Sequence, residues 1–300
     1  MAKGECTVSV DLRVCALSVG LFAVSGCTAF LPVRNDGRIP LAACTWVEDA
    51  PAIQAAGFDA WEWTVSSALM PDKSDAEWAP IRAKILAAPI PLVSCNGFIP
   101  GRFSLSNPLV SHDEPLAYAE KACRRADAIG LKYIVFGSGG ARRIPDDVDP
   151  DVGRARFISF CKALASRIAD CRVTIVLEPL NRREVNLLNT VADGIGMVDA
   201  IGSPRFRLLA DLFHMAREHE GPESIRRAGP RLCHVHIAEV ANRTWPGVDG
   251  DDFTPYFKAL RDIGYQGCVS IEASLPAPRP EEVPALRAKC FTHLDHMLNH

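Results

Sequence analysis

From residue 40 onward, short apolar runs alternate with longer stretches in which apolar residues recur at helical spacing. Short apolar runs of this kind are typical of buried strands, and the longer stretches are typical of amphipathic helices. The pattern predicts eight strands, at residues 41–47, 60–65, 91–97, 132–138, 173–179, 207–213, 232–238 and 268–274. Eight strand–helix units favour an α/β fold that consists of a single (β/α)8 TIM barrel, here over residues 40–300.

A doubly wound sheet is the alternative fold for this order of elements. That fold normally carries a glycine-rich phosphate loop after its first strand, whereas residues 45–51 read TWVEDAP. The glycine-rich stretch at residues 137–143, GSGGARR, is a weak indication of phosphate binding because it stands alone. The pattern therefore favours the barrel.

Composition and charge narrow the possible partners. The chain has 33 Lys and Arg against 36 Asp and Glu, a formal net charge of −3, and it has no run of basic residues. A nucleic-acid partner is not expected, because nothing in this pattern would dock on a phosphate backbone. The eleven cysteines include no C-x-x-C pair, so we predict reduced thiols and no cysteine-only metal site.

The N-terminus carries the features of an export signal. Residues 14–25 form an uncharged apolar run of signal-peptide length, preceded by Lys3 and Arg13 and too short to span a membrane. The following Gly26-Cys27 completes a segment that resembles a bacterial lipobox. We therefore expect a lipoprotein signal at 1–27 with lipidation of Cys27, a linker at 28–39, and an exported protein that touches the membrane only through this anchor. A cytoplasmic protein with a misassigned start is the alternative.

Polar residues gather at the carboxyl ends of the last four predicted strands, where barrel enzymes place their chemistry. Buried carboxylates need a cation or hydrogen-bond donors, and one divalent cation would satisfy all of them at once. The candidate ligands are Glu178, Asp211, His236 and Glu272. Three carboxylates and one imidazole suit Mn²⁺, Mg²⁺ or Co²⁺. His234 points the same way as His236, so alternation does not decide between them.

Four motifs in the second half of the chain resemble one known family. They are EPLNR at 178–182 followed by Glu184, LADLFHM at 209–215, HVHIAE at 234–239 followed by Asn242-Arg243, and SIE at 270–272. Together they resemble the xylose isomerase-like TIM barrels, and within these the ketose 3-epimerases typified by D-tagatose and D-psicose 3-epimerases.

The resemblance implies a function and a role for each motif residue. It assigns His236 to the metal, with Mn²⁺ as the expected ion. Glu178 and Glu272 would be ligands and also the acid/base pair, which moves a proton at a sugar carbon through an enediolate. His214, Glu184 and Arg243 would orient substrate hydroxyls, and a homo-oligomer is compatible with the family. From the residues alone, the alternatives are a solvated loop arginine for Arg243 and a surface salt bridge for Glu184.

Other functions use the same residues. A lyase, decarboxylase or dehydratase acting on a 3-oxo sugar or an inosose would need the same metal, and a non-catalytic sugar-binding lipoprotein is a further alternative. An endonuclease IV would need extra histidines where Asn96 and Gly137 stand. Glu62, at the end of the second predicted strand, would either touch substrate at the barrel mouth or serve a structural role.

Overall fold

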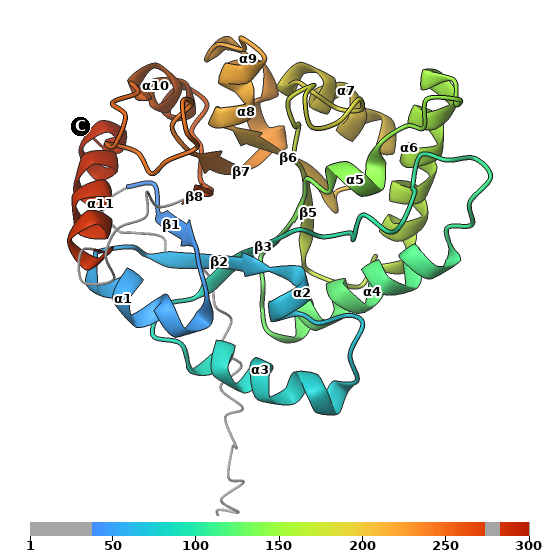
Figure 1. Ribbon diagram of the computed structural model, residues 1–300, viewed down its shortest axis with the longest axis horizontal. Helices are drawn as coiled ribbons and strands as arrows, with labels where there is room; N and C mark the ends of the chain where they lie inside the picture. The colour runs from blue at the N-terminus through green and yellow to red at the C-terminus, as the bar shows by residue number, and fades with distance from the viewer. Residues whose placement is uncertain (1–37, 274–282, 300) are drawn as a thin grey trace, which may run out of the picture.

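Eight parallel strands close into a barrel in the computed structural model, which describes residues 38–273 and 283–299 (Figure 1). Each strand pairs with its sequence neighbour, and the first pairs with the last. The prediction of a single TIM barrel is confirmed, and every predicted strand overlaps an observed one. The strands are β1 (Leu41–Cys44), β2 (Ala60–Thr64), β3 (Leu92–Asn96), β4 (Tyr133–Phe136), β5 (Thr174–Leu177), β6 (Phe206–Asp211), β7 (Leu232–Ile237) and β8 (Cys268–Ile271).

Helices form a ring outside the strands (Figure 1). The helices of this ring are α1 (Ala50–Ala55), α3 (Asp75–Ala87), α4 (Asp113–Ala128), α6 (Pro150–Arg167), α7 (Val191–Ile201), α9 (Glu223–Ala228), α10 (Thr254–Asp262) and α11 (Val283–Asn299). Short helices follow three of the strands at their carboxyl ends, and two 3₁₀ turns complete the set: α2 (Val65–Ala68), α5 (Gly139–Arg142), α8 (Leu212–Arg217), η1 (Val47–Asp49) and η2 (Gly229–Arg231). The sequence pattern did not predict α2, α5 and α8, because helices of four to six residues are too short to show helical periodicity.

Local sequence signals set several helix ends. Ser74 caps α3 in a capping box with Glu77, and Thr190 does the same for α7 with Asp193. Helix α7 ends at Gly202, whose φ of +69° is a left-handed conformation that glycine adopts without steric cost. These signals set the start of both helices and the end of α7.

Strand alternation divides the barrel into an outer and an inner layer. Outward side chains of the strands pack under the helices in the main core. A second cluster of buried residues fills the barrel interior: Ala42, Ala60, Val93, Tyr133, Val135, Val176, Leu209 and Cys268. The pairing register shifts between β2 and β3 at Trp61/Glu62 and between β6 and β7 at Leu208/Leu209. The second shift brings Asp211 opposite His236 at the carboxyl end.

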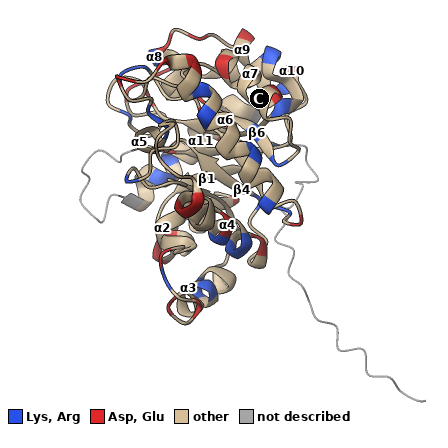
Figure 2. Cartoon of the chain, turned by 90° about the vertical axis from the view of Figure 1, so that its right-hand side faces the viewer, with Lys and Arg blue, Asp and Glu red and all other residues tan. Residues whose placement is uncertain are grey.

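The helices of the outer ring carry charged residues of both signs. Basic and acidic residues are interspersed over the helices (Figure 2). Among the described residues, no helix combines the length and the apolar character that crossing a bilayer requires. The cysteines in this part of the chain are all free thiols, as predicted. The predicted signal at 1–27, its Cys27 and nearly all of the linker lie outside the described residues.

Candidate functional site

Four strands deliver the predicted metal ligands to one point. Asp211 is the last residue of β6 and His236 lies in β7, while Glu178 and Glu272 directly follow β5 and β8. Each of the four contributes one ligand atom, and these atoms lie within 4.8 Å of one another. Alternation explains the convergence, because these positions continue the inward-facing row of each strand.

The geometry fits a divalent cation. His236 Nδ1 lies 3.1 Å from Glu178 Oε1 and 3.4 Å from Glu272 Oε2. Asp211 Oδ2 is buried and has no hydrogen-bond partner among the described residues. A buried carboxylate oxygen without a donor is costly, and a cation shared with two further carboxylates would satisfy it. The donor set is hard and rich in oxygen, as Mn²⁺ and Mg²⁺ prefer.

Glu62 separates the roles of the two histidines in β7. Its carboxylate lies 3.0 Å from His236 Nε2 and 3.0 Å from His234 Nε2, so each ring donates to it. Donation from Nε2 leaves Nδ1 of His236 free to face the carboxylates as a ligand. His234 lies deeper and packs against Tyr133, with 5.5 Å between the ring centroids. The structure therefore places His236, and not His234, in the ligand group.

Glu62 serves this structural role and does not line the mouth. Its side chain is fully buried, and Ser94 donates to it through a hydroxyl 2.5 Å away. Burial alone would raise the pKa of Glu62, but His236 and His234 lower that pKa well below its usual value. A carboxylate behind a ligating histidine fixes the ring's tautomer and orientation, which is the arrangement common around protein metals.

The three candidate carboxylate ligands differ in proton affinity. Burial, reinforced by Glu272, raises the pKa of Glu178. Burial raises the pKa of Asp211 to about 6. Glu272 is different: burial alone would raise its pKa, but His236 and Arg243 lower it. A bound cation would favour the ionised form of all three.

The predicted substrate-orienting residues surround this group. Arg243 donates to Glu272 Oε2 at 2.6 Å and lies 3.7 Å from Asp211 Oδ2, so it is not a solvated loop arginine. His214 Nε2 lies 3.5 Å from Asp211, and its Nδ1 lies 3.9 Å from Glu184. Glu184 accepts from Asn181 at 2.9 Å rather than from a surface cation. The structure brings all three predicted residues to the site, and their roles toward a substrate stay predictions.

Sequence reasoning missed two asparagines. Asn96, the last residue of β3, donates to Glu272 Oε1 at 2.8 Å. The amide of Asn181 lies 2.8 Å from His214 Nδ1 and so links His214 to Glu184. The rule that selected the carboxylates also applies to Asn96, because it ends a strand with a polar side chain.

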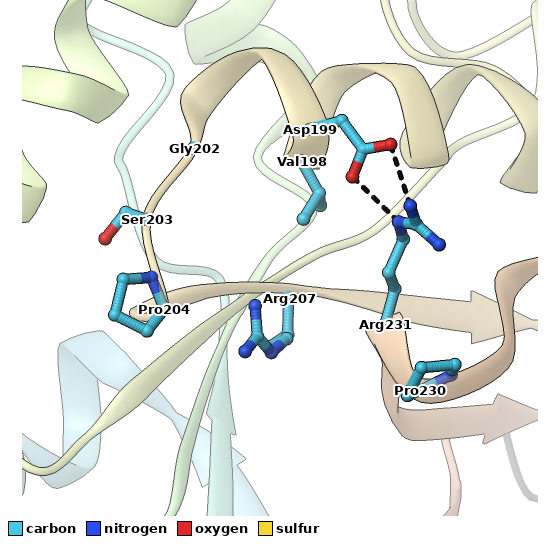
Figure 3. Close-up of a pocket in the computed structure, with 8 residues that line it drawn as sticks. All are labelled: Val198, Asp199, Gly202, Ser203, Pro204, Arg207, Pro230 and Arg231. Atoms are coloured by element: carbon cyan, nitrogen blue, oxygen red, sulfur yellow. Dashed lines mark hydrogen bonds and ion pairs between the residues drawn. The ribbon is translucent and has the colours of Figure 1, made fainter.

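Two hollows lie outside the ligand group. One of about 650 Å³ is shown in Figure 3, and it lies at the amino ends of β6 and β7, opposite to Asp211 and His236. Its main polar contact is the ion pair of Arg231 with Asp199, at 2.8 and 2.9 Å. The other, of about 530 Å³, borders the site at Asn181 and continues to Arg217 and Val240. The first is on the wrong end of the barrel for chemistry at the ligands.

The fold and site thus define a (β/α)8 barrel with a candidate metal centre at the carboxyl ends of its strands. The profile of the xylose isomerase-like TIM barrel family matches residues 50–289. The chain belongs to that family, as its motifs predicted.

Several of the relatives and solved structures that resemble this chain are named as sugar epimerases. The chain is 33% identical over 224 residues to a D-psicose 3-epimerase of Agrobacterium fabrum, covering 72% of this chain and 75% of that one. It is 38% identical over 125 residues to a D-psicose 3-epimerase of Enterocloster bolteae, with 41% of each chain covered, so it matches about two fifths of that relative's length. The D-psicose 3-epimerase of Clostridium cellulolyticum H10, solved with D-tagatose, superposes with a TM-score of 0.78. That comparison covers 87% of this chain and 100% of the other at 21% identity, which establishes the shared fold.

Proposed function

We propose that this protein is a divalent-metal-dependent sugar epimerase that inverts carbon 3 of a ketose. The observation that carries the proposal is the placement of two glutamates, Glu178 and Glu272, on non-neighbouring strands around one candidate cation position. Inversion at carbon requires one group to remove a proton and a second group to return it from the other face. The relatives named as ketose 3-epimerases support the same chemistry.

Glu178, Asp211, His236 and Glu272 would hold the cation. When bound, a divalent cation, with Mn²⁺ as the expected ion, supplies Lewis acidity toward the carbonyl and neighbouring hydroxyl oxygens of the sugar.

The surroundings of the two glutamates suggest which one acts as the base and which one acts as the acid. Both oxygens of Glu272 accept hydrogen bonds, from Asn96 at 2.8 Å and from Arg243 at 2.6 Å, which favours its ionised form as a base. Glu178 is more deeply buried than Glu272, and burial raises its pKa, so Glu178 takes up a proton more readily than Glu272 does. In one direction Glu272 removes the proton and Glu178 returns one, and in the other direction the roles exchange. Such positioned transfer contributes roughly 10²–10⁴ in rate.

Residues around the glutamates would orient the sugar. Arg243, His214 and Glu184 carry donors and acceptors that can bind hydroxyls beside the reacting carbon. Asn181 links His214 to Glu184 and holds their relative position. Orientation of this kind limits the reaction to one carbon.

The experiment is proton NMR of a panel of ketoses and 3-oxo sugars in D₂O with the full chain and Mn²⁺. Deuterium entering at carbon 3, accompanied by the epimer and abolished by EDTA, is the expected result. Release of water or carbon dioxide without exchange into recovered substrate would select a lyase instead. Sugar binding by calorimetry with no exchange at any carbon would indicate a non-catalytic binding protein.

We also propose that residues 1–27 are a lipoprotein signal and that the mature chain begins at lipidated Cys27. The apolar run at 14–25 and the lipobox-like VSGC support this proposal. Mass spectrometry of the protein expressed in a bacterium is the test, with a diacylglyceryl-modified Cys27 expected. A retained Met1 would contradict it.

A further inference from the structure

Glu239 lies two residues beyond β7 and is fully buried, although it contacts none of the four candidate ligands in the described structure. A buried carboxylate without a cation must be stabilised by donors. The donors here come from a single segment, residues 240–250, called the β7 loop below. That loop also carries Arg243.

The Glu239 carboxylate binds the far end of the β7 loop through consecutive backbone amides. Oε1 accepts from the N–H groups of Gly247 at 2.8 Å and Gly250 at 3.0 Å. Oε2 accepts from the N–H of Val248 at 3.2 Å and also from that of Asp249. Gly247 and Gly250 have φ of +89° and +93°, and this conformation favours glycine. The loop thus encloses one carboxylate with four N–H groups, in the manner of an anion nest.

The near end of the loop is tied to the same residue. The N–H of Glu239 donates to the carbonyl of Thr244 at 2.9 Å, and the Thr244 hydroxyl lies 3.2 Å from Glu239 Oε2. Arg243 directly precedes Thr244 and has φ of +52°, an uncommon conformation for a residue with a side chain. Such a conformation persists where surrounding bonds over-determine it, and Glu239 supplies those bonds.

The guanidinium of Arg243 reaches the site from this fixed backbone. It donates to Glu272 at 2.6 Å, and its central carbon lies 4.8 Å from the centroid of the Phe213 ring. Its side chain is about one third exposed, so the contact with Glu272 depends on where the loop holds the backbone.

We propose that Glu239 is a positioning residue that organises the β7 loop and thereby holds Arg243 against Glu272. This inference rests on the proposed function for its kinetic consequence, whereas its structural consequence stands apart from any activity. A glutamine at 239 would place an amide N–H₂ against backbone N–H groups at one of the two oxygen positions. The loop amides would then lose one of the two oxygens that accept from them. As a consequence, the backbone at Arg243 would no longer be held in one position.

The structural arm of the test is hydrogen exchange of the full chain, followed by mass spectrometry of peptides that cover residues 240–250. Glu239→Gln is expected to speed exchange at the amides of 247–250 by about tenfold or more, since each loses a charge-assisted bond. The matched control is Asp252→Asn, an exposed residue just after the loop whose Oδ1 accepts from Thr254 N–H and contacts no loop amide. Unchanged exchange in Glu239→Gln would overturn the proposal.

The kinetic arm is a double-mutant cycle with Arg243→Gln, measured as kcat/KM for the ketose that the wild type epimerises. Glu239→Gln is expected to lower kcat/KM about tenfold and Arg243→Gln about 100-fold, because small misplacements near a reacting centre have effects of this size. In the Arg243→Gln background, Glu239→Gln should change the rate by less than about twofold. Equal effects in both backgrounds would show that Glu239 does not act through Arg243.

Two substitutions at Thr244 test the same proposal in case the Glu239 variant does not fold. Thr244→Val removes the hydroxyl bonded to Glu239 and Asp249, and Thr244→Ser retains it. We expect Val to lower kcat/KM and Ser to restore it, and equal rates would contradict the proposal. If the wild type turns over no ketose, the proposed function fails, while hydrogen exchange still decides whether Glu239 holds the loop.

Discussion

The two ends of the barrel interior differ sharply, although the same eight strands build both. Toward the amino ends, inward positions carry small apolar residues such as Ala42, Val135 and Val176. At the carboxyl ends, the same inward rows continue into Glu62, Glu178, Asp211, His236 and Glu272. One end is therefore stabilised by burial of apolar surface, and the other by pairing of charged groups with one another and with hydrogen-bond donors. The difference indicates that the residues that stabilise the barrel and the residues that would carry out the chemistry lie in separate layers. Mutations in one layer should therefore change mainly the free energy of unfolding, and mutations in the other mainly the catalytic rate.

The largest loss of activity is expected when either glutamate of the proposed acid/base pair at the carboxyl end is replaced. Glu272→Gln and Glu178→Gln keep the shape of the side chain but remove the ability to take a proton. Each should lower the rate of deuterium exchange at the reacting carbon by about 10³-fold or more. The measurement is the NMR assay, with bound manganese determined for each variant. Exchange at the wild-type rate in Glu272→Gln, with metal retained, would break the assignment.

The next largest effect is expected from metal removal, which should lower the stability of the protein by an amount that depends on pH. In the metal-free protein the pKa of Asp211 is raised to about 6, so the folded state keeps a proton that the unfolded chain loses near pH 4. Stability of the metal-free protein should therefore fall, through this group, as pH rises from about 4 to 6. Saturating Mn²⁺ at 100 times its Kd should add about 2.7 kcal/mol.

The measurement is Tm with Mn²⁺ and with EDTA, at pH 5 and at pH 7.5. Protons compete with the cation for Asp211, so the difference in Tm should be larger at pH 7.5. A larger difference at pH 5, or none at either pH, would argue against these ligands. Sodium chloride at the same ionic strength is the control for screening.

A substitution at Glu62 tests whether this buried carboxylate, which lies behind His236, supports metal binding. Glu62→Gln leaves one of its two oxygens and weakens the orientation of His236, so the affinity for Mn²⁺ should fall about 10–100-fold. Isothermal calorimetry measures this directly. The matched control is Glu120→Gln on α4, whose side chain is bonded only to surface arginines among the residues described. Equal affinity in the two variants would remove Glu62 from the metal site.

The smallest effect on activity is expected at the amino end. Val135→Ala on β4 leaves a cavity in the barrel interior and should lower the free energy of unfolding by about 2 kcal/mol. The variant should keep kcat/KM within about twofold, because no candidate ligand lies on β4. Urea unfolding and the NMR assay together check both values. A loss of activity as large as in Glu272→Gln would mean that the two layers are not separable.

Much of this arrangement could be predicted from the sequence. Alternation in VTIVLE makes Glu178 continue the inward row of β5, and the eight apolar runs predict the barrel. Each signal is local, because the period of a strand depends only on neighbouring residues. The candidate ligands stand out in the sequence because carboxylates are uncommon at the ends of apolar strands and need a partner there.

Other features depended on how distant segments meet. Alternation gave His234 and His236 the same direction, and the choice between them came from the register of β7 against β6 and from Glu62 on β2. Asn96 reaches Glu272 across 176 positions of sequence. The placement of Arg243 rests on a loop wrapped around a buried carboxylate.

By itself the sequence determined the strands, the inward rows and the ligand types, since these follow from residue chemistry and a two-residue period. Strand alternation left the choice of histidine open and the motif resemblance pointed to His236, but only the tertiary structure shows how His236 meets the carboxylates, what Glu62 supports and where Arg243 points. The physical reason is that barrel closure and strand register set distances between residues far apart in the chain, and no local pattern encodes those distances.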